Sequence, residues 1–266
     1  MSPRKGLRGP VPDEPRPGAI VLRSEREIAR LRAAGRVVGQ VLDQLAPLIV
    51  PGVRTADLDR AAERLIRHAG GIPTFKGYQG FPASICASVN EEVVHGIPGP
   101  RRLEPGDIIA VDVGVTLDGY VGDGARTFAL PPVSEASQRL LDVTQEALAA
   151  GIAVARPGGR VGDISHAVQA VVEAAGYSCV RKFCGHGVGT SMHEEPSVPN
   201  YGPAGRGPRL EAGMVLAIEP MVNAGTFDVS VGEDGWVVRT RDGALSAHFE
   251  HTVAIGPEGP EILTLA

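Results

Sequence analysis

Five side chains of the metal-binding type stand in apolar or glycine-rich surroundings along this sequence: Asp112, Asp123, His186, Glu219 and Glu250. A charged group inside an apolar segment is costly unless it is paired or bound to a cation. Four carboxylates would balance two divalent cations, and an oxygen-rich set with one imidazole and no thiolate suits pairs of Mn²⁺, Fe²⁺, Co²⁺ or Zn²⁺. Such pairs acidify water and stabilise an oxyanion, so the set predicts metal-dependent hydrolysis.

The two aspartates fall on a predicted β-hairpin. An apolar strand over 108–114 and a return strand over 120–128 flank an Asp-Gly pair, which is a strong turn signal. This register puts Asp112 opposite Ala125, with Asp123 diagonal to Asp112 on the same face at about 7 to 8 Å. The pattern alone also allows two solvent-facing aspartates beside a turn, so the hairpin by itself leaves both interpretations open.

The other three residues belong to the C-terminal part of the chain. His186 stands between glycines in CGHGVG, where missing side chains let a ligand approach, although such a histidine is more often a plain loop residue. No Gly-Lys-Ser/Thr follows, so this is not a phosphate-binding loop. A proline holds Glu219 extended at the end of an apolar strand over 215–218. The segment 247–253 is predicted as one strand with Glu250 in its middle.

Helices and an internal repeat are expected to position these strands. The first helical pattern starts with a capping box at Ser24 and ends at Pro51-Gly52. Further helices are predicted over 55–69, 134–155 and 163–175. Residues 51–71 also align with 157–177, matching a Pro-Gly pair, an arginine, an aspartate and a glycine. A chance match is the alternative, but we infer two helix-helix-strand halves from a duplication, with a cleft between them where active sites commonly lie.

Composition limits the class of protein. With 266 residues, 43% of them hydrophobic, the chain has material for one core. The net charge of -5 favours neither nucleic acid nor an anionic membrane, and no apolar run approaches the roughly 18 to 20 residues that span a bilayer. Three cysteines are too few for a disulfide framework, which fits a reducing compartment. We expect a flexible arm over 1–23 without a secretory signal, and a single catalytic domain over 24–266.

Taken in order, the motifs resemble those of type I methionine aminopeptidases over residues 24–260. They are GYQGFP, SIC, NEEVVHGIP, AVDVG, GDGART, CGHGVG, MHEEP, AIEP and FEHT. The resemblance implies a pita-bread fold of the α/β (α+β) class, with two pseudo-symmetric halves around a central curved antiparallel sheet. It also implies two divalent metal ions, Co, Mn, Fe or Zn, with Asp123 and Glu250 bridging them. The implied ligands are Asp112, Asp123, His186, Glu219 and Glu250.

The same resemblance implies roles for further residues. Glu219 would accept the proton of the attacking water, while neutral imidazoles of His95 and His193 would hold the substrate amide and the tetrahedral intermediate. The methionine pocket would be apolar and shaped for an unbranched thioether. Its lining would comprise Tyr78, Phe81, Cys86, Met192 and Trp236. A simpler interpretation of His95 and His193 is that they are hydrogen-bonded loop residues, and a simpler interpretation of the pocket residues is that they pack in the core. The Cys86 thiol could also be a nucleophile, but no nearby motif supplies a base for it.

The implied function is removal of the initiator methionine from nascent polypeptides when the second residue is small. It would be carried out in the cytoplasm by a monomer that needs neither nucleic acid nor a membrane. The task would also bring the protein to the ribosome, although no residue shows such contact. Two alternatives share the fold. An Xaa-Pro aminopeptidase or prolidase usually carries a large N-terminal domain, for which residues 1–23 leave little room, and a non-catalytic binding protein would lack ligands that are all present here.

Overall fold

The computed structural model of the protein describes residues 18–266, so residues 1–17 of the expected arm lie outside the described part. Within that part, the chain forms four α-helices: α1 (Glu25–Leu45), α2 (Thr55–His68), α3 (Glu135–Val154) and α4 (Val161–Ala174). Two short 3₁₀ helices are η1 (Ala46–Leu48) and η2 (Tyr78–Gly80).

Serine side chains start the two long helices. The Ser24 Oγ accepts a hydrogen bond from the Glu27 N–H at 3.4 Å, and the Glu27 carboxylate accepts one from the Ser24 N–H at 2.9 Å. Ser134 caps α3 in the same position. The first helix is shorter than predicted, because it ends at Leu45 instead of continuing to the Pro-Gly pair. Pro47 has no N–H for the helical hydrogen bonds, and the chain tightens into η1 there.

The two halves repeat one helix start, as the alignment of 51–71 with 157–177 predicted. Arg54 precedes α2 and Arg160 precedes α4. The backbone N–H of each arginine donates to an aspartate in the first helical turn, at 3.3 Å to Asp57 and 2.7 Å to Asp163. Each arginine also forms an isolated antiparallel bridge to a second arginine farther along the chain. The two halves therefore share the same local structure at these helix starts, and a duplication of the chain stays a prediction.

All strand pairs of the described residues are antiparallel. The sheet of the N-terminal half contains β1 (Ile72–Pro73), β2 (Ile85–Val89), β4 (Ile108–Leu117) and β5 (Tyr120–Ala129). The sheet of the C-terminal half contains β7 (Gly185–Gly187), β8 (Glu194–Val198), β9 (Val215–Ile218), β14 (His251–Gly256) and β15 (Gly259–Ile262). One smaller sheet contains β6 (Ser178–Cys179), β10 (Met221–Asn223) and β13 (Ser246–His248). Another contains β3 (Glu92–Val94), β11 (Val229–Val231) and β12 (Val238–Thr240).

The hairpin of β4 and β5 has the predicted register. Asp112 pairs with Ala125, and Asp123 pairs with the residue two positions after Asp112 on β4. The two aspartates are therefore diagonal to each other on one face of the hairpin. The turn falls at Asp118 and Gly119, which have positive φ angles of 50° and 81°. Positive φ at both central positions is the geometry that an Asp-Gly pair favours.

The predicted strand over 247–253 is wrong in one respect, because it is two strands with Glu250 in the gap between β13 and β14. β13 pairs with β10 and β14 pairs with β9, and these partners are themselves separated at Glu219 and Pro220. Proline has no N–H to continue the hydrogen-bond ladder. The segment after β9 and the segment after β13 therefore each pass into a different sheet at this point. Glu250 instead exchanges backbone hydrogen bonds with Ala125 of β5, at 2.9 and 3.3 Å. Backbone hydrogen bonds at this strand break therefore connect the two halves.

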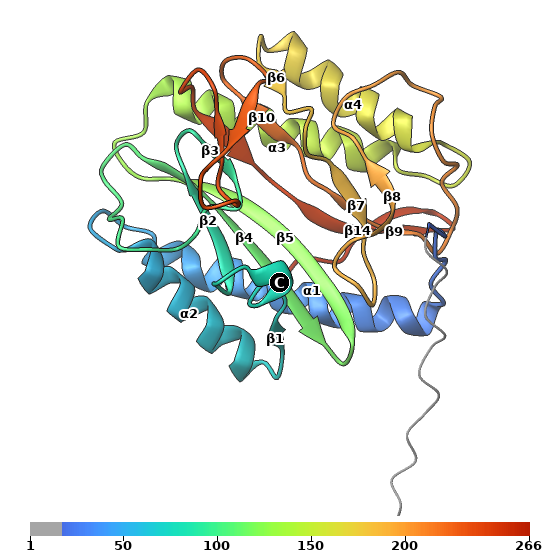
Figure 1. Cartoon of the computed structure of the whole chain (residues 1–266). Helices are drawn as coiled ribbons and strands as arrows, with labels where there is room; N and C mark the ends of the chain where they lie inside the picture. Colours follow the sequence, from blue (N-terminus) through green and yellow to red (C-terminus); the bar gives the residue numbers. More distant parts are fainter. Residues whose placement is uncertain (1–17) are drawn as a thin grey trace, which may run out of the picture.

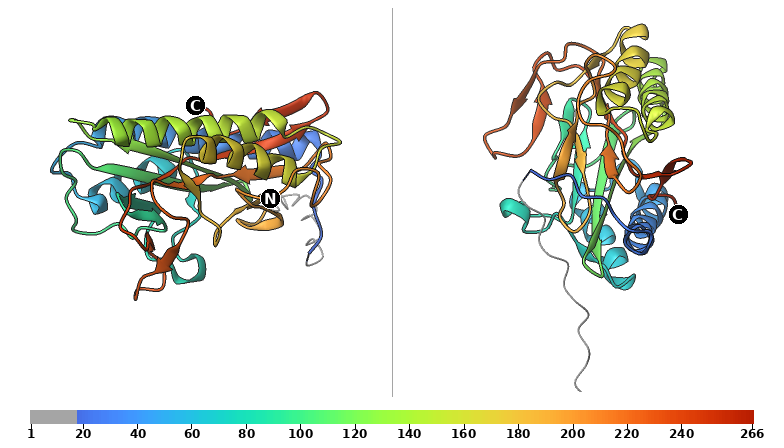
Figure 2. Two further views of the ribbon diagram at one scale, coloured as in Figure 1. Left: turned by 90° about the horizontal axis from the view of Figure 1, so that it is seen from above. Right: turned by 90° about the vertical axis from the view of Figure 1, so that its right-hand side faces the viewer.

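The long helices cover one face of the joined sheets. In Figure 1, α1 and α3 run behind the strands of the two halves. Both further views place these helices on the same side, with the small sheet of β3, β11 and β12 on the other side (Figure 2). Buried apolar clusters fill the space between the helices and each half-sheet, with Leu42 and Ile109 in one and Leu148 and Leu216 in the other. No helix in the described part is long and apolar enough to cross a membrane.

Candidate metal centre

The five predicted metal ligands come from both halves of the chain and line one cavity. Asp112 lies on β4 and Asp123 on β5, whereas His186 lies on β7. Glu219 directly follows β9, and Glu250 directly precedes β14. The cavity has a volume of about 170 Å³. All the predicted catalytic, substrate-binding and metal-binding residues line it, together with two that were not predicted, Phe75 and Gln79.

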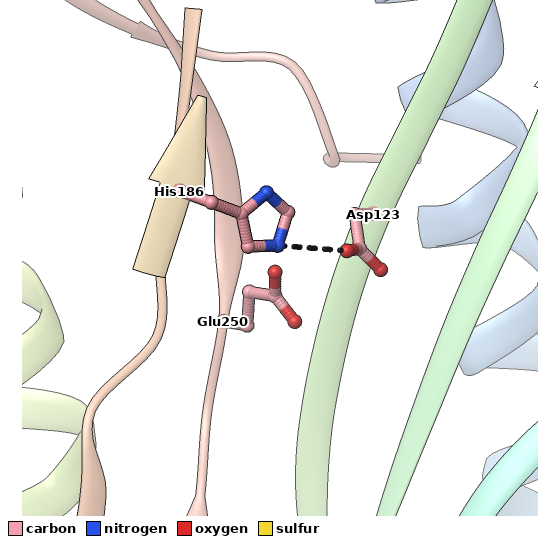
Figure 3. A group of neighbouring side chains, drawn as sticks. All are labelled: Asp123, His186 and Glu250. Carbon is pink, nitrogen blue, oxygen red and sulfur yellow. Dashed lines mark ion pairs between the residues drawn. The ribbon is translucent and has the colours of Figure 1, made fainter. Parts of the chain in front are cut away.

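Three of these side chains point toward one another across the joint between the halves (Figure 3). One ligand atom each of Asp123, His186 and Glu250 lies within 4.8 Å of the others. The His186 Nε2 atom is 3.7 Å from Asp123 Oδ2 and 3.6 Å from Glu219 Oε1. Atoms that bind one metal ion at about 2.0 to 2.2 Å lie roughly 3 to 4 Å apart, so the spacing suits a shared cation.

Three buried carboxylate oxygens of the cavity have no hydrogen-bond partner within the protein. They are Asp112 Oδ1, Asp123 Oδ1 and Glu250 Oε1. Leaving a buried donor or acceptor unsatisfied costs about 1 to 3 kcal/mol, and more for a charged group. A donor set of carboxylates and one imidazole, without a thiolate, therefore fits divalent cations as the partners of these atoms.

Burial raises the pKa of every carboxyl group in the set. It raises the pKa of Asp112 to about 7. It also raises the pKa of Asp123 well above its usual value, and the charges of Asp112 and Glu219 add to the effect. Burial and then neighbouring carboxylates do the same to the pKa of Glu219 and of Glu250. Without a cation the site therefore holds protons near neutral pH, and cations must displace them on binding.

The histidines of the cavity are neutral near pH 7. Burial, with a smaller contribution from His193, lowers the pKa of His95 to about 4 and the pKa of His186 to about 4. Burial also lowers the pKa of His193, whose ring centroid is 4.3 Å from that of His186. The Gly187 carbonyl oxygen lies 2.8 Å from His186 Nδ1 and only accepts, so Nδ1 carries the proton. The Nε2 atom, which faces the carboxylates, is left free to bind a metal ion.

The wall beside this cluster is apolar. Phe81 and Trp236 pack edge to face with ring centroids 5.0 Å apart, and Cys86 and Met192 are buried next to them. The Tyr78 hydroxyl lies 2.8 Å from the Nδ1 atom of His193. The structure thus brings the predicted pocket residues and the predicted catalytic histidines to the same cavity.

Phe75 was not predicted, although the sequence held a signal for it. Gly114 follows Asp112 on the same face of β4, and a Cβ at this glycine would overlap the Phe75 ring. A glycine inside a strand often marks a close approach of another group. The glycine of the AVDVG motif therefore makes room for an aromatic wall of the cavity.

His248 and Thr252 next to the cluster were also absent from the predicted site. His248 is 2% exposed, with its Nε2 atom 3.7 Å from Glu219 Oε2 and 3.9 Å from Glu250 Oε2. The Thr252 Oγ1 accepts from the Asp123 N–H at 3.1 Å and donates to the Asp123 carbonyl at 2.7 Å. Each of these residues is two positions from Glu250 in the sequence. Because side chains alternate between the faces of a strand, the predicted strand would have put both on the same face as Glu250.

Known proteins are similar to this chain over most of its length. Residues 29–257 match the model of Metallopeptidase family M24. A methionine aminopeptidase of Clostridium acetobutylicum is 55% identical over 247 residues, which cover 92% of this chain and 99% of that protein. Methionine aminopeptidase 1 of Bacillus subtilis is 52% identical over 245 residues, covering 92% of this chain and 99% of that protein.

Solved structures share the fold. The crystal structure of methionine aminopeptidase from Thermotoga maritima matches with a TM-score of 0.92 at 42% identity, covering 93% of this chain and 100% of that chain. Prolidase from Pyrococcus furiosus matches with a TM-score of 0.72 at 21% identity, covering 92% of this chain and 65% of that chain. At that identity, the likeness to the prolidase concerns the fold alone.

Proposed function

The chain belongs to metallopeptidase family M24, and we propose that it is a methionine aminopeptidase, which removes the N-terminal methionine of polypeptides whose second residue is small. Its fold is the pita-bread fold that the motifs predicted. The observation that carries the proposal is a metal-ligand cluster that shares one small cavity with an apolar, sulfur-containing wall. Similarity to methionine aminopeptidases over nearly the whole chain supports the same reaction.

The cavity offers a surface for each part of an N-terminal methionine. Its carboxyl groups would hold divalent ions, and such an ion can bind the nitrogen of the neutral amino group that a free N-terminus presents. Beside them, Phe81, Cys86, Met192 and Trp236 form an apolar and polarisable wall. Such a wall suits an unbranched thioether side chain. An internal peptide bond has no free amino group, so the arrangement favours an exopeptidase.

We assign two divalent metal ions per chain to the cluster, which the carboxylates and the imidazole of five side chains would hold. The full ligand set is Asp112, Asp123, His186, Glu219 and Glu250. Two divalent ions would balance four carboxylates, and Mn²⁺, Fe²⁺, Co²⁺ and Zn²⁺ all suit these donors. When bound, the ions would supply Lewis acidity to activate water and to stabilise negative charge on the substrate carbonyl.

The proton transfer and the binding of the amide fall to side chains of the cavity. The Asn200 Nδ2 donates to the carbonyl oxygen of Glu219 at 2.9 Å and holds the strand end, so that the Glu219 carboxylate can accept the proton of the attacking water. His95 and His193 donate hydrogen bonds to the substrate amide and the developing oxyanion. In this assignment, the Tyr78 hydroxyl donates to His193 Nδ1, so the proton of that ring is on Nε2.

We place this activity in the cytoplasm, because nascent polypeptides present their N-termini there. The task brings the enzyme to the ribosome. A monomer suffices in this proposal, since one chain supplies the five proposed metal ligands, both histidines and the apolar wall of the cavity.

Peptide turnover tests the proposal. Metal-free protein is titrated separately with Mn²⁺, Fe²⁺, Co²⁺ and Zn²⁺, and release is measured from Met-Ala-Ser and from an Xaa-Pro peptide. Metal-dependent release of methionine alone is the expected result, and full activity at two equivalents of metal would support the paired site. Release only from the proline peptide would assign the chain to the prolidase-like relatives. No release with any metal would favour a binding protein.

A further inference from the structure

Arg23, in the segment that precedes α1, is buried against the loop that carries His193. We define the His193 loop as residues 188–193, between β7 and β8. The Arg23 side chain is 3% exposed, and its Nη2 donates to Glu194 Oε2 at 2.5 Å. The only other carboxylate that pairs with it among the described residues is Glu27, at 3.5 Å. A buried arginine is uncommon unless it is paired, so this contact links the start of the domain to the His193 loop.

Glu194 passes this contact on to the backbone of the loop. Its Oε1 atom accepts hydrogen bonds from the backbone N–H groups of Thr190 at 2.9 Å and Ser191 at 3.0 Å. Its Oε2 atom is the one that contacts Arg23. Because each oxygen has its own partners, the carboxylate cannot rotate without breaking one set of bonds. The backbone just before Met192 and His193 is therefore held by a buried charge that Arg23 balances.

The arginine is itself held by the strands of the site. Its backbone N–H donates to the Gly213 carbonyl at 2.7 Å, just ahead of β9. Its guanidinium packs on Gly189 so closely that a Cβ at this glycine would overlap it. The Gly189 carbonyl in turn accepts from the Val121 N–H of β5 at 2.8 Å. Arg23 therefore lies where the His193 loop, β5 and β9 meet.

The same N-terminal segment lines a second cavity beside the histidines. Gly18, Ala19 and Val21 line this cavity, which has a volume of about 440 Å³. His186 and His193 belong to its lining and to that of the metal centre. The segment that leads into α1 is thus part of the wall around these rings.

We propose that Arg23 is a positioning residue for His193. It touches neither the substrate nor the reacting atoms, and it acts through Glu194 on the His193 loop. It thereby keeps Met192 at the apolar wall and the His193 ring beside that of His186. The inference rests on the proposed function for its kinetic test, and on the hydrogen bonds alone for its exchange test.

The kinetic test compares the same substitution in a buried and in an exposed ion pair. Arg23→Met removes the buried charge, and Arg32→Met is the matched control, because Arg32 pairs with Glu261 at 2.6 Å where both side chains are exposed. Misplacing a reacting group by about 1 Å costs up to about 10²-fold, so Arg23→Met should lower kcat for Met-Ala-Ser at least about tenfold with little change in KM. Arg32→Met should stay within about twofold. Equal kcat values for the two variants would overturn the proposal.

A second background separates positioning from a general loss of structure. If Arg23 acts through His193, then Arg23→Met has no further effect on kcat in a His193→Ala protein, because the group that it positions is gone. An undiminished tenfold loss in that background would overturn the proposal. Arg23→Lys keeps the charge but not the fork of donors, and it serves the same comparison if the methionine variant does not fold.

Hydrogen exchange tests the contact without any turnover. The amides of Thr190 and Ser191 should exchange faster in Arg23→Met than in the wild-type chain, and at the wild-type rate in Arg32→Met. Unchanged protection in Arg23→Met would overturn the inference. Because this measurement does not use a substrate, it also judges the inference for a chain that releases no methionine.

Discussion

The two halves of the protein share a backbone plan but not a chemistry. The Leu130 N–H donates to the Asp107 carbonyl at 2.8 Å, and in the second half the Ile255 N–H donates to the Met214 carbonyl at 2.8 Å. These matched bonds, together with the matched helix starts, make the β4 and β5 pair of the first half equivalent to the β9 and β14 pair of the second.

The joint between the halves shows the same equivalence at the site itself. The Thr252 Oγ1 bonds to both backbone groups of Asp123, at 3.1 and 2.7 Å. The Thr127 Oγ1 bonds to both backbone groups of His248, at 2.9 and 2.7 Å. Two equivalent threonines therefore hold the backbones of two equivalent residues in the opposite half.

Side chains at equivalent positions differ, and this difference creates the site. The equivalent pairs are Asp112 and Glu219, Asp123 and His248, and Ala125 and Glu250. Two similar backbone scaffolds thus face each other, and different side chains at equivalent positions make one asymmetric set of donors. The helices of each half pack against its strands, whereas the candidate site residues lie where the two halves meet.

The largest effect on turnover is expected from a substitution of Glu219, whereas its equivalent, Asp112, should mainly affect metal binding. Glu219→Gln should lower kcat for Met-Ala-Ser by about 10²- to 10⁴-fold at saturating metal, because it removes the proposed proton acceptor. Asp112→Asn should weaken metal binding more than it lowers kcat at saturating metal, since the proposal gives Asp112 a role in metal binding alone. A near-normal kcat for Glu219→Gln would assign the proton to another group.

Glu250→Ala would remove one of these three differences, because alanine already stands at the equivalent position, Ala125. Loss of this proposed ligand should weaken Mn²⁺ binding by at least about 10- to 100-fold, the range seen when only the partners of metal ligands are removed. Calorimetric titration measures it. The control is Glu261→Ala, which removes an exposed carboxylate from β15 and should leave the affinity unchanged. Equal affinities for the two variants would contradict the assignment.

A pH series tests the charge of Asp112 in the metal-free protein. Its pKa is raised to about 7 by burial, against about 3.9 in an unfolded chain. A raised pKa favours the fold while the group is protonated, and this contribution is lost as the pH rises from about 4 through 7. Asparagine does not ionise, so the Tm of Asp112→Asn relative to wild type should increase over that range. A Tm difference that does not change with pH would contradict the raised pKa.

The smallest expected effects concern the repeated helix starts. Asp163→Ala should lower the free energy of unfolding by about 1 kcal/mol, because Asp163 accepts from the Arg160 N–H and from the Gly205 N–H, each at 2.7 Å. Asp57→Ala should cost less, since its bond to the Arg54 N–H is 3.3 Å long. Urea unfolding measures both, and kcat should stay at the wild-type value. A larger cost for Asp57→Ala would reverse the comparison.

Much of the site was predictable because its signals are local. The Asp-Gly turn sets the register that brings Asp112 and Asp123 to one face, and the capping pattern at Ser24 sets the start of α1. The strand break at Glu250 was not predictable from its own residues. It follows from Pro220 on a partner strand, and neighbouring strands are known only once they pair.

The family, the order of the motifs, the helix starts and the hairpin could be predicted from local patterns, since caps, turns and periodicity act over a few residues. How the halves join became known from the folded chain, and with it the surroundings of His248, the break at Glu250 and the pairing of Arg23 with Glu194 across 171 positions. Burial and pairing of charges depend on which segments pack together. No local pattern in this chain specifies that packing.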